Sequence, residues 1–255
     1  MILTADSEQR RAANRRKTGN GWLTTFIGEN RNTLQPGAPV PPAGTLYPMA
    51  FLVEKQANAV VKPHFHEADQ FQVVVQGGGR LGLHDVGSVA VHYTDPFSAY
   101  GPIVAAGDGV SWFTLRNSWD PGAQYMPQER DRLRAARARY QHRESTAAPL
   151  PPLSPAELAA VRDAGCVEVL EHAADGLGSW RYTVPALGGV IGPDPADGGG
   201  QFWLVLAGSA AVPGSAQLPV QSCVFVGPED AALAVTAGAA GAELLCLQFP
   251  RLARH

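Results

Sequence analysis

The 255-residue sequence has few cysteines, no long apolar run and little charge. Its three cysteines, Cys166, Cys223 and Cys246, are odd in number and form no C-x-x-C motif. This argues against a disulfide framework and a thiolate zinc site, and it favours a reducing cytoplasm. No apolar run approaches the roughly 18 residues that span a bilayer, and the first residues lack the pattern of a secretory leader. We therefore expect a cytoplasmic protein with no membrane partner.

The small amount of charge also limits the partners. Charged residues make up 17% of the chain and the net charge is -3, so the sequence offers no basic surface for nucleic acid. Hydrophobic residues make up 45%, enough for a folded core. The 28 glycines and 21 prolines predict many turns between short strands. These features favour an all-β protein.

A proline-rich stretch suggests two domains. Four prolines lie between residues 145 and 155, where they stiffen the backbone toward extended conformations. We expect an amino-terminal domain over 1–144, a linker over 145–155 and a carboxy-terminal domain over 156–255. Residues 129–143 are predicted to form a helix before the linker. A capping-box pattern at Ser154 to Glu157 predicts a short helix after it, ending near Gly165.

The two halves of the chain resemble each other. Residues 50–71 align without a gap with residues 181–202, and the Gln-Phe pairs at 70–71 and 201–202 coincide. Both segments contain short runs rich in Val, Leu and Phe, bounded by Gly, Pro and Asp, which is typical of antiparallel strands. The repeat predicts two linked β-barrels of one architecture.

Two histidines in the first half indicate a metal site. Residues two apart on a strand point to the same face, so His64 and His66 project together while Phe65 turns to the opposite layer. Neutral imidazole is a good ligand for Fe, Mn, Co, Ni, Cu and Zn. The alternative interpretation is that both histidines line a vestigial pocket, each satisfied by hydrogen bonds to its neighbours.

The stretch from Pro63 to Phe71, with Gly77 following, resembles the first motif of the cupin superfamily. In that motif, an HxH pair is followed by three or four residues, an acidic ligand and then a Gly. Gln70 stands in the place of the acid. The resemblance implies a bicupin, with two jelly-roll barrels of the double-stranded β-helix type. It also implies a divalent first-row metal ion, such as Fe, Ni, Mn or Zn, in the amino-terminal barrel.

The second cupin motif supplies a further histidine, and this chain departs from it. That position falls on Leu233 in the second half and on Tyr100 in the first. Pro195 and Asp197 take the places of the two motif histidines in the second half. The resemblance therefore implies a degenerate carboxy-terminal barrel without histidine ligands.

The remaining candidate ligands each have two interpretations. Gln70 is either a ligand or a structural residue, because Gln201 takes the same place in a half that lacks the histidines. Tyr100 either binds metal as a phenolate or donates a hydrogen bond to a ligand. His92 is either a third imidazole ligand or a packed polar residue. The predicted metal-binding residues are thus His64, His66, Gln70 and His92, and the predicted catalytic residues are Tyr100 and Gln70.

Aromatic residues are dense in the first half, at Tyr93, Phe97, Trp112, Phe113, Trp119 and Tyr125. They form either core and loop packing or the wall of a pocket for an apolar organic substrate. Arg116 either pairs with a substrate carboxylate or lies on the surface. The substrate-binding candidates are Tyr93, Phe97, Trp112 and Arg116.

The resemblance implies a metal-dependent enzyme acting on a small organic substrate. Cupins include dioxygenases, isomerases, decarboxylases and lyases, and among these we favour a mononuclear, dioxygenase-like enzyme. The alternative is a non-catalytic, small-molecule-binding cupin with a decayed metal site. We also expect a homodimer, because barrel edges offer surfaces for pairing and symmetric dimers are the commonest oligomers.

Overall fold

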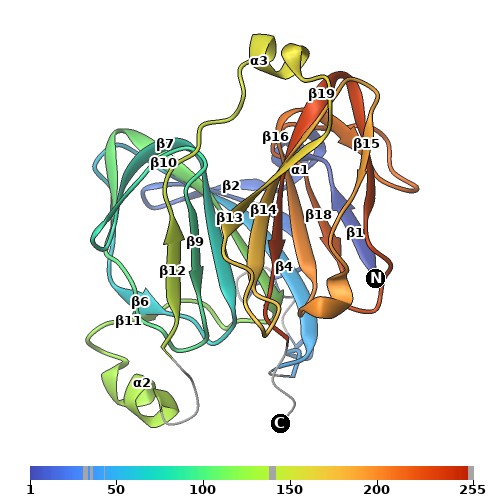
Figure 1. Ribbon diagram of the computed structural model, residues 1–255. Helices are drawn as coiled ribbons and strands as arrows, with labels where there is room; N and C mark the ends of the chain where they lie inside the picture. Colours follow the sequence, from blue (N-terminus) through green and yellow to red (C-terminus); the bar gives the residue numbers. More distant parts are fainter. Residues whose placement is uncertain (31–33, 35–36, 43, 138–141, 252–255) are drawn as a thin grey trace. The chain divides into compact units, whose positions relative to one another are not determined.

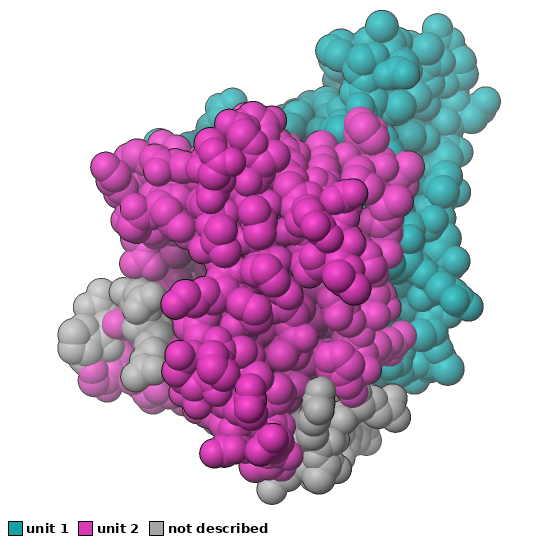
Figure 2. Space-filling model, turned by 90° about the vertical axis from the view of Figure 1, so that its left-hand side faces the viewer, with its two compact units in different colours: residues 1–14, 152–255 teal, residues 15–151 magenta. Residues whose placement is uncertain are grey.

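The computed structural model describes residues 1–30, 34, 37–42, 44–137 and 142–251. The chain divides into two compact units, unit 1 with residues 1–14 and 152–255 and unit 2 with residues 15–151 (Figures 1 and 2). Antiparallel strands dominate both units, as the composition predicts. In the described ranges, no helix has the length and apolar character needed to cross a membrane.

Unit 2 is built on a nine-stranded antiparallel sheet (Figure 1). Its strands lie in the order β12 (Glu144–Ala147), β9 (Val91–Thr94), β7 (Gln70–Leu81), β10 (Ile103–Ser118), β4 (Leu46–Lys55), β3 (Gly21–Ile27) and β2 (Arg15–Thr18). At the sides of this path, β5 (Val60–Val61) pairs with β10 and β8 (His84–Val86) pairs with β7. A separate pair joins β6 (His64–Phe65) to β11 (Gln124–Tyr125), and helix α2 (Arg130–Arg137) follows β11.

Alternation along β7 separates two layers of side chains. Phe71 and Val73 are fully buried in an apolar layer, where the ring of Phe71 lies 5.1 Å from that of Tyr93. Because successive residues of a strand face opposite sides, Gln70 and Gln72 point to the other layer. Both are buried. The second layer therefore carries buried polar groups that require hydrogen-bond partners.

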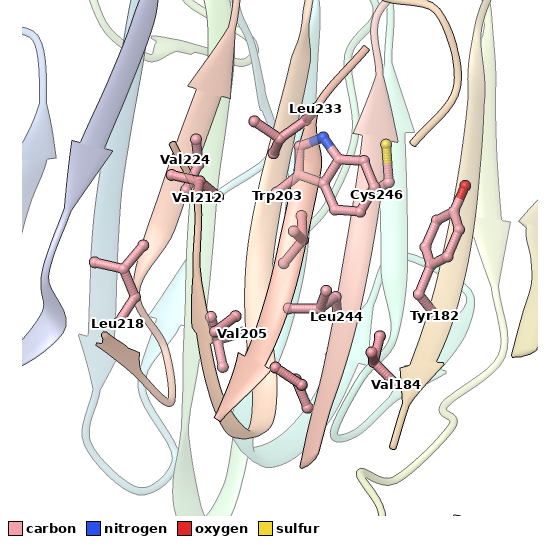
Figure 3. Packing of buried hydrophobic residues seen from close by; sticks show 14 of the residues in the cluster. Tyr182, Val184, Trp203, Val205, Val212, Leu218, Val224, Leu233, Leu244 and Cys246 are labelled. Atoms are coloured by element: carbon pink, nitrogen blue, oxygen red, sulfur yellow. The ribbon is translucent and has the colours of Figure 1, made fainter. Parts of the chain in front are cut away.

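Unit 1 is built on an eight-stranded antiparallel sheet. Its strands lie in the order β1 (Ile2–Ala5), β18 (Cys223–Val226), β16 (Gln201–Ala211), β19 (Ala234–Gln248), β14 (Gly178–Val184) and β13 (Gly165–Leu170). At the sides, β15 (Gly189–Ile191) pairs with β19 and β17 (Leu218–Pro219) pairs with β16. The unit also contains helices α1 (Ser7–Asn14) and α3 (Pro155–Ala160) and the 3-10 helix η1 (Pro195–Asp197). Figure 3 shows part of its core, where Trp203 lies beside Leu233 and Cys246.

The sequence repeat corresponds to a repeat of strand order. The order β9, β7, β10, β4 and β3 in unit 2 matches β18, β16, β19, β14 and β13 in unit 1. Gly77 and Gly208, which the repeat aligns, have φ values of 68° and 70°. A Cβ atom on either glycine would lie 2.1 Å from a backbone carbonyl oxygen of the adjacent strand. Both positions therefore need glycine for the same steric reason.

The observed boundaries differ from the expected ones in three places. Residues 1–14 belong with the carboxy-terminal residues, because β1 pairs with β18. Residues 144–147 form β12, which pairs with β9, although most of them were expected in the linker. The helix expected over 129–143 is observed from Arg130 to Arg137, and residues 138–141 lie outside the described residues.

The helix after the linker begins as expected and ends early. It has the predicted capping box, in which the side chains and backbones of Ser154 and Glu157 bond reciprocally. The helix ends at Ala160 rather than near Gly165, which instead begins β13.

Candidate functional site

The two motif histidines lie together inside unit 2. His64 and His66 are 4% and 7% exposed, and their ring centroids are 5.1 Å apart at right angles. The backbone of His64 bonds reciprocally with that of Tyr100, at 3.1 and 3.0 Å. Phe65 faces the other way and packs on Phe97. The pair thus has the shared orientation that the HxH spacing predicts.

Hydrogen bonds at Nδ1 fix the state of both imidazoles. Nδ1 of His64 donates to the carbonyl oxygen of Lys62 at 2.8 Å, and Nδ1 of His66 donates to Oδ1 of Asp120 at 2.8 Å. Because both partners are acceptors, the proton is at Nδ1 and each Nε2 carries a lone pair. Burial, followed by the neighbouring His66, lowers the pKa of His64 to about 3. Burial and Arg116 also lower the pKa of His66, so both rings are neutral at pH 7.

Arg116 is buried at the centre of this cluster. Its Nε and Nη2 donate to Oε1 of Gln70 at 3.0 and 2.6 Å, and Nη1 lies 3.3 Å from Oδ1 of Asp120. Nη2 is also 3.1 Å from both ring nitrogens of His66. An atom equidistant from both nitrogens lies over the face of the ring rather than along either lone pair. The guanidinium therefore stacks on His66 and does not occupy the lone pair of its Nε2.

Gln70 is fully engaged in this network. Its Oε1 faces the guanidinium, which can only donate, and its Nε2 donates to Oη of Tyr100 at 2.7 Å. Burial raises the pKa of Tyr100, so its phenol stays protonated. Gln70 therefore links Arg116 to Tyr100.

The aligned Gln201 of unit 1 is engaged in a similar way. Its Nε2 donates to Gln248 at 2.8 Å and to the carbonyl oxygen of Pro193 at 3.0 Å, and its Oε1 accepts from Nε1 of Trp203 at 3.0 Å. In each unit, a buried glutamine connects neighbouring polar groups.

Asp120 completes the cluster and was not found by the sequence analysis. Its carboxylate accepts from the backbone nitrogens of Glu67 and Gly122, each at 2.8 Å, as well as from His66. Burial opposes its ionisation, but Arg116 and His66 outweigh burial and hold its pKa below the ordinary range. Asp120 lies 54 residues from His66, and its only local signal is the Asp-Pro-Gly turn that it begins.

His92 does not join the histidine pair. Its Nδ1 is 3.1 Å from Oε1 of Gln72, and its Nε2 is 3.0 Å from Oε1 of Glu144 on β12. Both ring nitrogens therefore have partners, and neither is free for a metal. His92 behaves as the packed polar residue that the sequence left as its second interpretation, and it contacts the ring of Tyr100 at 5.1 Å.

The four substrate-binding candidates fall in three places. Tyr93 packs on Phe71 and donates to Asp69, while Phe97 packs on Phe65, so both lie in the layer opposite the imidazoles. Neither residue supports the predicted substrate wall. Arg116 is buried in the polar cluster rather than exposed. Trp112 lines a cavity of ligand size.

That cavity has a volume of about 770 Å³ and lies at one side of unit 2. Its walls come from the end of β4, from β5, from Trp112 within β10 and from the segment 123–129, which includes Tyr125. No imidazole is among its lining residues in the described part of the chain, although the ring of Tyr125 lies 5.6 Å from that of His64. The space beside His92 and Gln72 measures only about 10 Å³, too small for a substrate.

The side chains of the cluster do not fit a first-row metal ion as they are arranged. Two imidazole lone pairs suit such an ion, but Oε1 of Gln70 is taken by Arg116 and the phenol of Tyr100 is protonated. Within the described ranges, no group of three or more His, Cys, Asp or Glu side chains could hold a metal. The positive charge between His66, Gln70 and Asp120 is the guanidinium of Arg116.

No family model and no curated protein sequence matches the chain. It is similar to the crystal structure of a bacterial pirin from Escherichia coli in complex with nickel(II), with a TM-score of 0.59 and 12% identity over 98% of this chain and 100% of the other. A proposed dioxygenase from Nostoc punctiforme gives a TM-score of 0.58 and 12% identity over 100% and 85% of the two chains. An oxalate decarboxylase variant from Bacillus subtilis gives 0.56 and 10% identity over 99% and 78%.

At such low identity these similarities establish the fold alone. The three proteins are of the cupin fold, and the similarity covers nearly the whole length of this chain. The chain is therefore an antiparallel β protein with the cupin fold.

Proposed function

We propose that unit 2 is a cupin-type barrel that binds a small organic molecule in its 770 Å³ cavity. The observation that supports this function is the cavity itself, whose volume lies within the range of about 300 to 1,000 Å³ found for small-molecule sites. Its walls combine apolar and aromatic side chains with an equal number of amide and charged side chains, and such polar groups can fix the orientation of a bound molecule.

The polar cluster consists of His64, His66, Gln70, Tyr100, Arg116 and Asp120. In this proposal it holds the backbone of the cavity-lining Lys62 through His64, and it requires no divalent metal. A dication bound by His64 and His66 would lie close to the guanidinium of Arg116, and charges of the same sign repel strongly in a buried site. The carboxylate of Asp120 is already paired with Arg116 and His66, and Gln70 adds no negative charge for a metal ion. The function is thus the second of the two that the sequence predicts, binding by a cupin whose metal site has decayed.

Unit 1 is the degenerate half of a bicupin in this proposal. Pro195 and Asp197, in the places of the motif histidines, form the 3-10 helix η1, and Leu233 is buried in the apolar core. These three residues therefore do not form a metal-binding site like that of the cupin motif. The role of unit 1 is then packing rather than ligand binding.

Filling the cavity tests the proposed function. Val60 lines the cavity and is 54% exposed, so a Val60→Trp substitution should occupy part of the volume without disturbing the core. Leu83→Trp, at a residue 89% exposed and outside the lining, is the matched control. Calorimetry with naphthyl compounds of positive, neutral and negative charge should detect binding that V60W reduces and L83W leaves unchanged. Equal binding by both variants, or no binding to the wild type, would refute a ligand site in this cavity.

A metal-dependent, oxygenase-like enzyme is the second candidate. One observation favours it, namely that His64 and His66 both carry Nε2 lone pairs. It would require Arg116 to leave its present partners. Elemental analysis of protein purified without a histidine tag separates the two functions. We expect far less than one equivalent of Fe, Ni, Mn or Zn. Near-stoichiometric metal that disappears in His64→Ala and His66→Ala would replace our proposal with the enzyme.

A further inference from the structure

The cavity has an apolar floor and a cationic side. Val53, Val61 and the indole of Trp112 form a continuous apolar surface, and Tyr125 adds an aromatic ring. Two ammonium groups, of Lys55 and Lys62, lie among the lining residues beside this surface. A flat apolar body would pack against the floor, and the side chains around it determine which charge such a ligand can carry.

Lys55 is a partly buried cation that bonds to a neutral amide. It lies at the end of β4, and its Nζ donates to Oδ1 of Asn20, a neutral amide, at 2.6 Å. Of the residues that the structure describes, none provides a carboxylate within ion-pair distance of this ammonium. Burial lowers the pKa of Lys55, which reflects the cost of keeping this charge partly out of water. A ligand carboxylate would offset that cost.

Lys62 provides the second cation, on a backbone anchored by His64. Its carbonyl oxygen accepts from Nδ1 of the buried His64, so its backbone is tied to the polar cluster. Its side chain is exposed at the cavity, and among described residues it has no hydrogen-bond or ion-pair partner. The hydrogen bond from His64 thus fixes the backbone of Lys62 at the edge of the cavity.

The balance of charge along the lining is positive. Glu129 is the one acidic residue among the described lining residues, against the two lysines. Burial raises the pKa of the nearby Glu67, and the carboxylate of Glu129 adds to this effect. One carboxylate therefore leaves a net positive charge facing an apolar, partly enclosed volume, where attraction for an anion is stronger than in open water.

We infer that the ligand of this cavity is an organic anion with a flat apolar body. Its carboxylate would be held by Lys55 and Lys62, and its ring system would lie against Trp112. This inference deepens the proposed function and rests on it, because it specifies the chemical class of the molecule bound.

Matched ligands and matched lysine variants test this inference. The probes are 2-naphthoate, 2-naphthamide and 2-naphthylmethylamine, which share one ring system and differ in charge. The variants are Lys55→Met and Lys62→Met, with Lys17→Met as control, since Lys17 is exposed on β2 and lies outside the cavity lining. Lys55→Arg keeps the charge and checks that any loss does not come from local unfolding.

Calorimetry should give an affinity for naphthoate about tenfold higher than for naphthamide, with the amine weakest. K55M and K62M should lower naphthoate affinity toward that of the amide, while K55R and K17M should retain it. Equal binding of all three probes, or a preference for the amine, would overturn the inference and leave small-molecule binding in place. If none of the probes binds, the inference and the proposed function both fail.

Discussion

The guanidinium of Arg116 donates two hydrogen bonds to a single oxygen, Oε1 of Gln70, from Nε at 3.0 Å and from Nη2 at 2.6 Å. In the cupin motif this position carries an acidic metal ligand, and here it carries an amide that holds a cationic side chain. The guanidinium also reaches Asp120 and stacks on His66. The positive charge beside the buried carboxylate of Asp120 thus comes from a side chain of the protein, Arg116, rather than from a bound metal ion.

Removing the guanidinium should destabilise unit 2. Arg116→Met leaves the buried carboxylate of Asp120 without its charge partner, and breaking a buried pair in this way costs about 3 to 5 kcal/mol. Urea unfolding measures the loss. Arg80→Met is the control, since the Arg80–Asp85 pair is exposed and contributes less than about 1 kcal/mol. The double variant R116M/D120N should recover part of the loss. Equal stability of R116M and R80M would contradict the role assigned to Arg116.

Gln70 and Gln201 should both contribute to the stability of their units through buried hydrogen bonds. Gln70→Leu leaves N–H groups of Arg116 unpaired, and Gln201→Leu leaves Nε1 of Trp203 unpaired. Each loss of a buried acceptor should lower the free energy of unfolding by roughly 1 to 3 kcal/mol. Thermal unfolding of both variants provides the comparison, with Gln124→Leu at a partly exposed position as control. An unchanged melting temperature in Q201L would remove the parallel between the two units.

The stability of unit 2 should fall as the pH is lowered from neutral. The pKa of His64 is about 3 in the folded protein, below the value of about 6.5 for a free imidazole, so the unfolded chain takes up the proton first. The contribution is therefore complete above pH 6.5 and declines as the pH falls toward 3. At pH 4 the loss of stability relative to neutral pH amounts to on the order of 3 kcal/mol.

A His64→Gln variant isolates this contribution. Urea unfolding between pH 4 and 7 should have a shallower pH dependence in H64Q than in the wild type, since the titrating ring is gone. His84→Gln, at an exposed residue, should retain the wild-type slope. Parallel pH profiles for the wild type and H64Q would show that His64 is not held neutral by burial.

The aligned glycines should be equally intolerant of a side chain. In Gly77→Ala and Gly208→Ala, the new Cβ would meet a carbonyl oxygen at 2.1 Å on a backbone with positive φ, so one strand must shift. We expect a loss of about 3 kcal/mol for each. Gly107→Ala, where no atom lies within 4 Å, is the control and should be nearly neutral. Differential scanning calorimetry measures all three, and tolerance of either substitution would mean that the close approach is not required.

Local sequence patterns determined a large part of this protein. The glycine and proline content and the short runs rich in Val, Leu and Phe predict the all-β class. The two-residue spacing of His64 and His66 predicts their shared face, with Phe65 on the other. The repeat aligns Gly77 with Gly208, and the two glycines share a positive φ. These inferences succeed because the side-chain direction in a strand depends on the chain over only a few residues.

Only the tertiary structure decided what surrounds the two imidazoles. Arg116 lies 50 residues from His66 and reaches it because β10 pairs with β7, which places its side chain beside Gln70. Asp120, which pairs with His66, comes from the loop after β10. Strand β12 brings Glu144 to His92, so that the Nε2 atom of this third imidazole is already hydrogen-bonded. Such partners are set by strand register and chain crossing, which no local periodicity encodes. Whether two neutral imidazoles face a metal ion or a guanidinium therefore depended on long-range pairing.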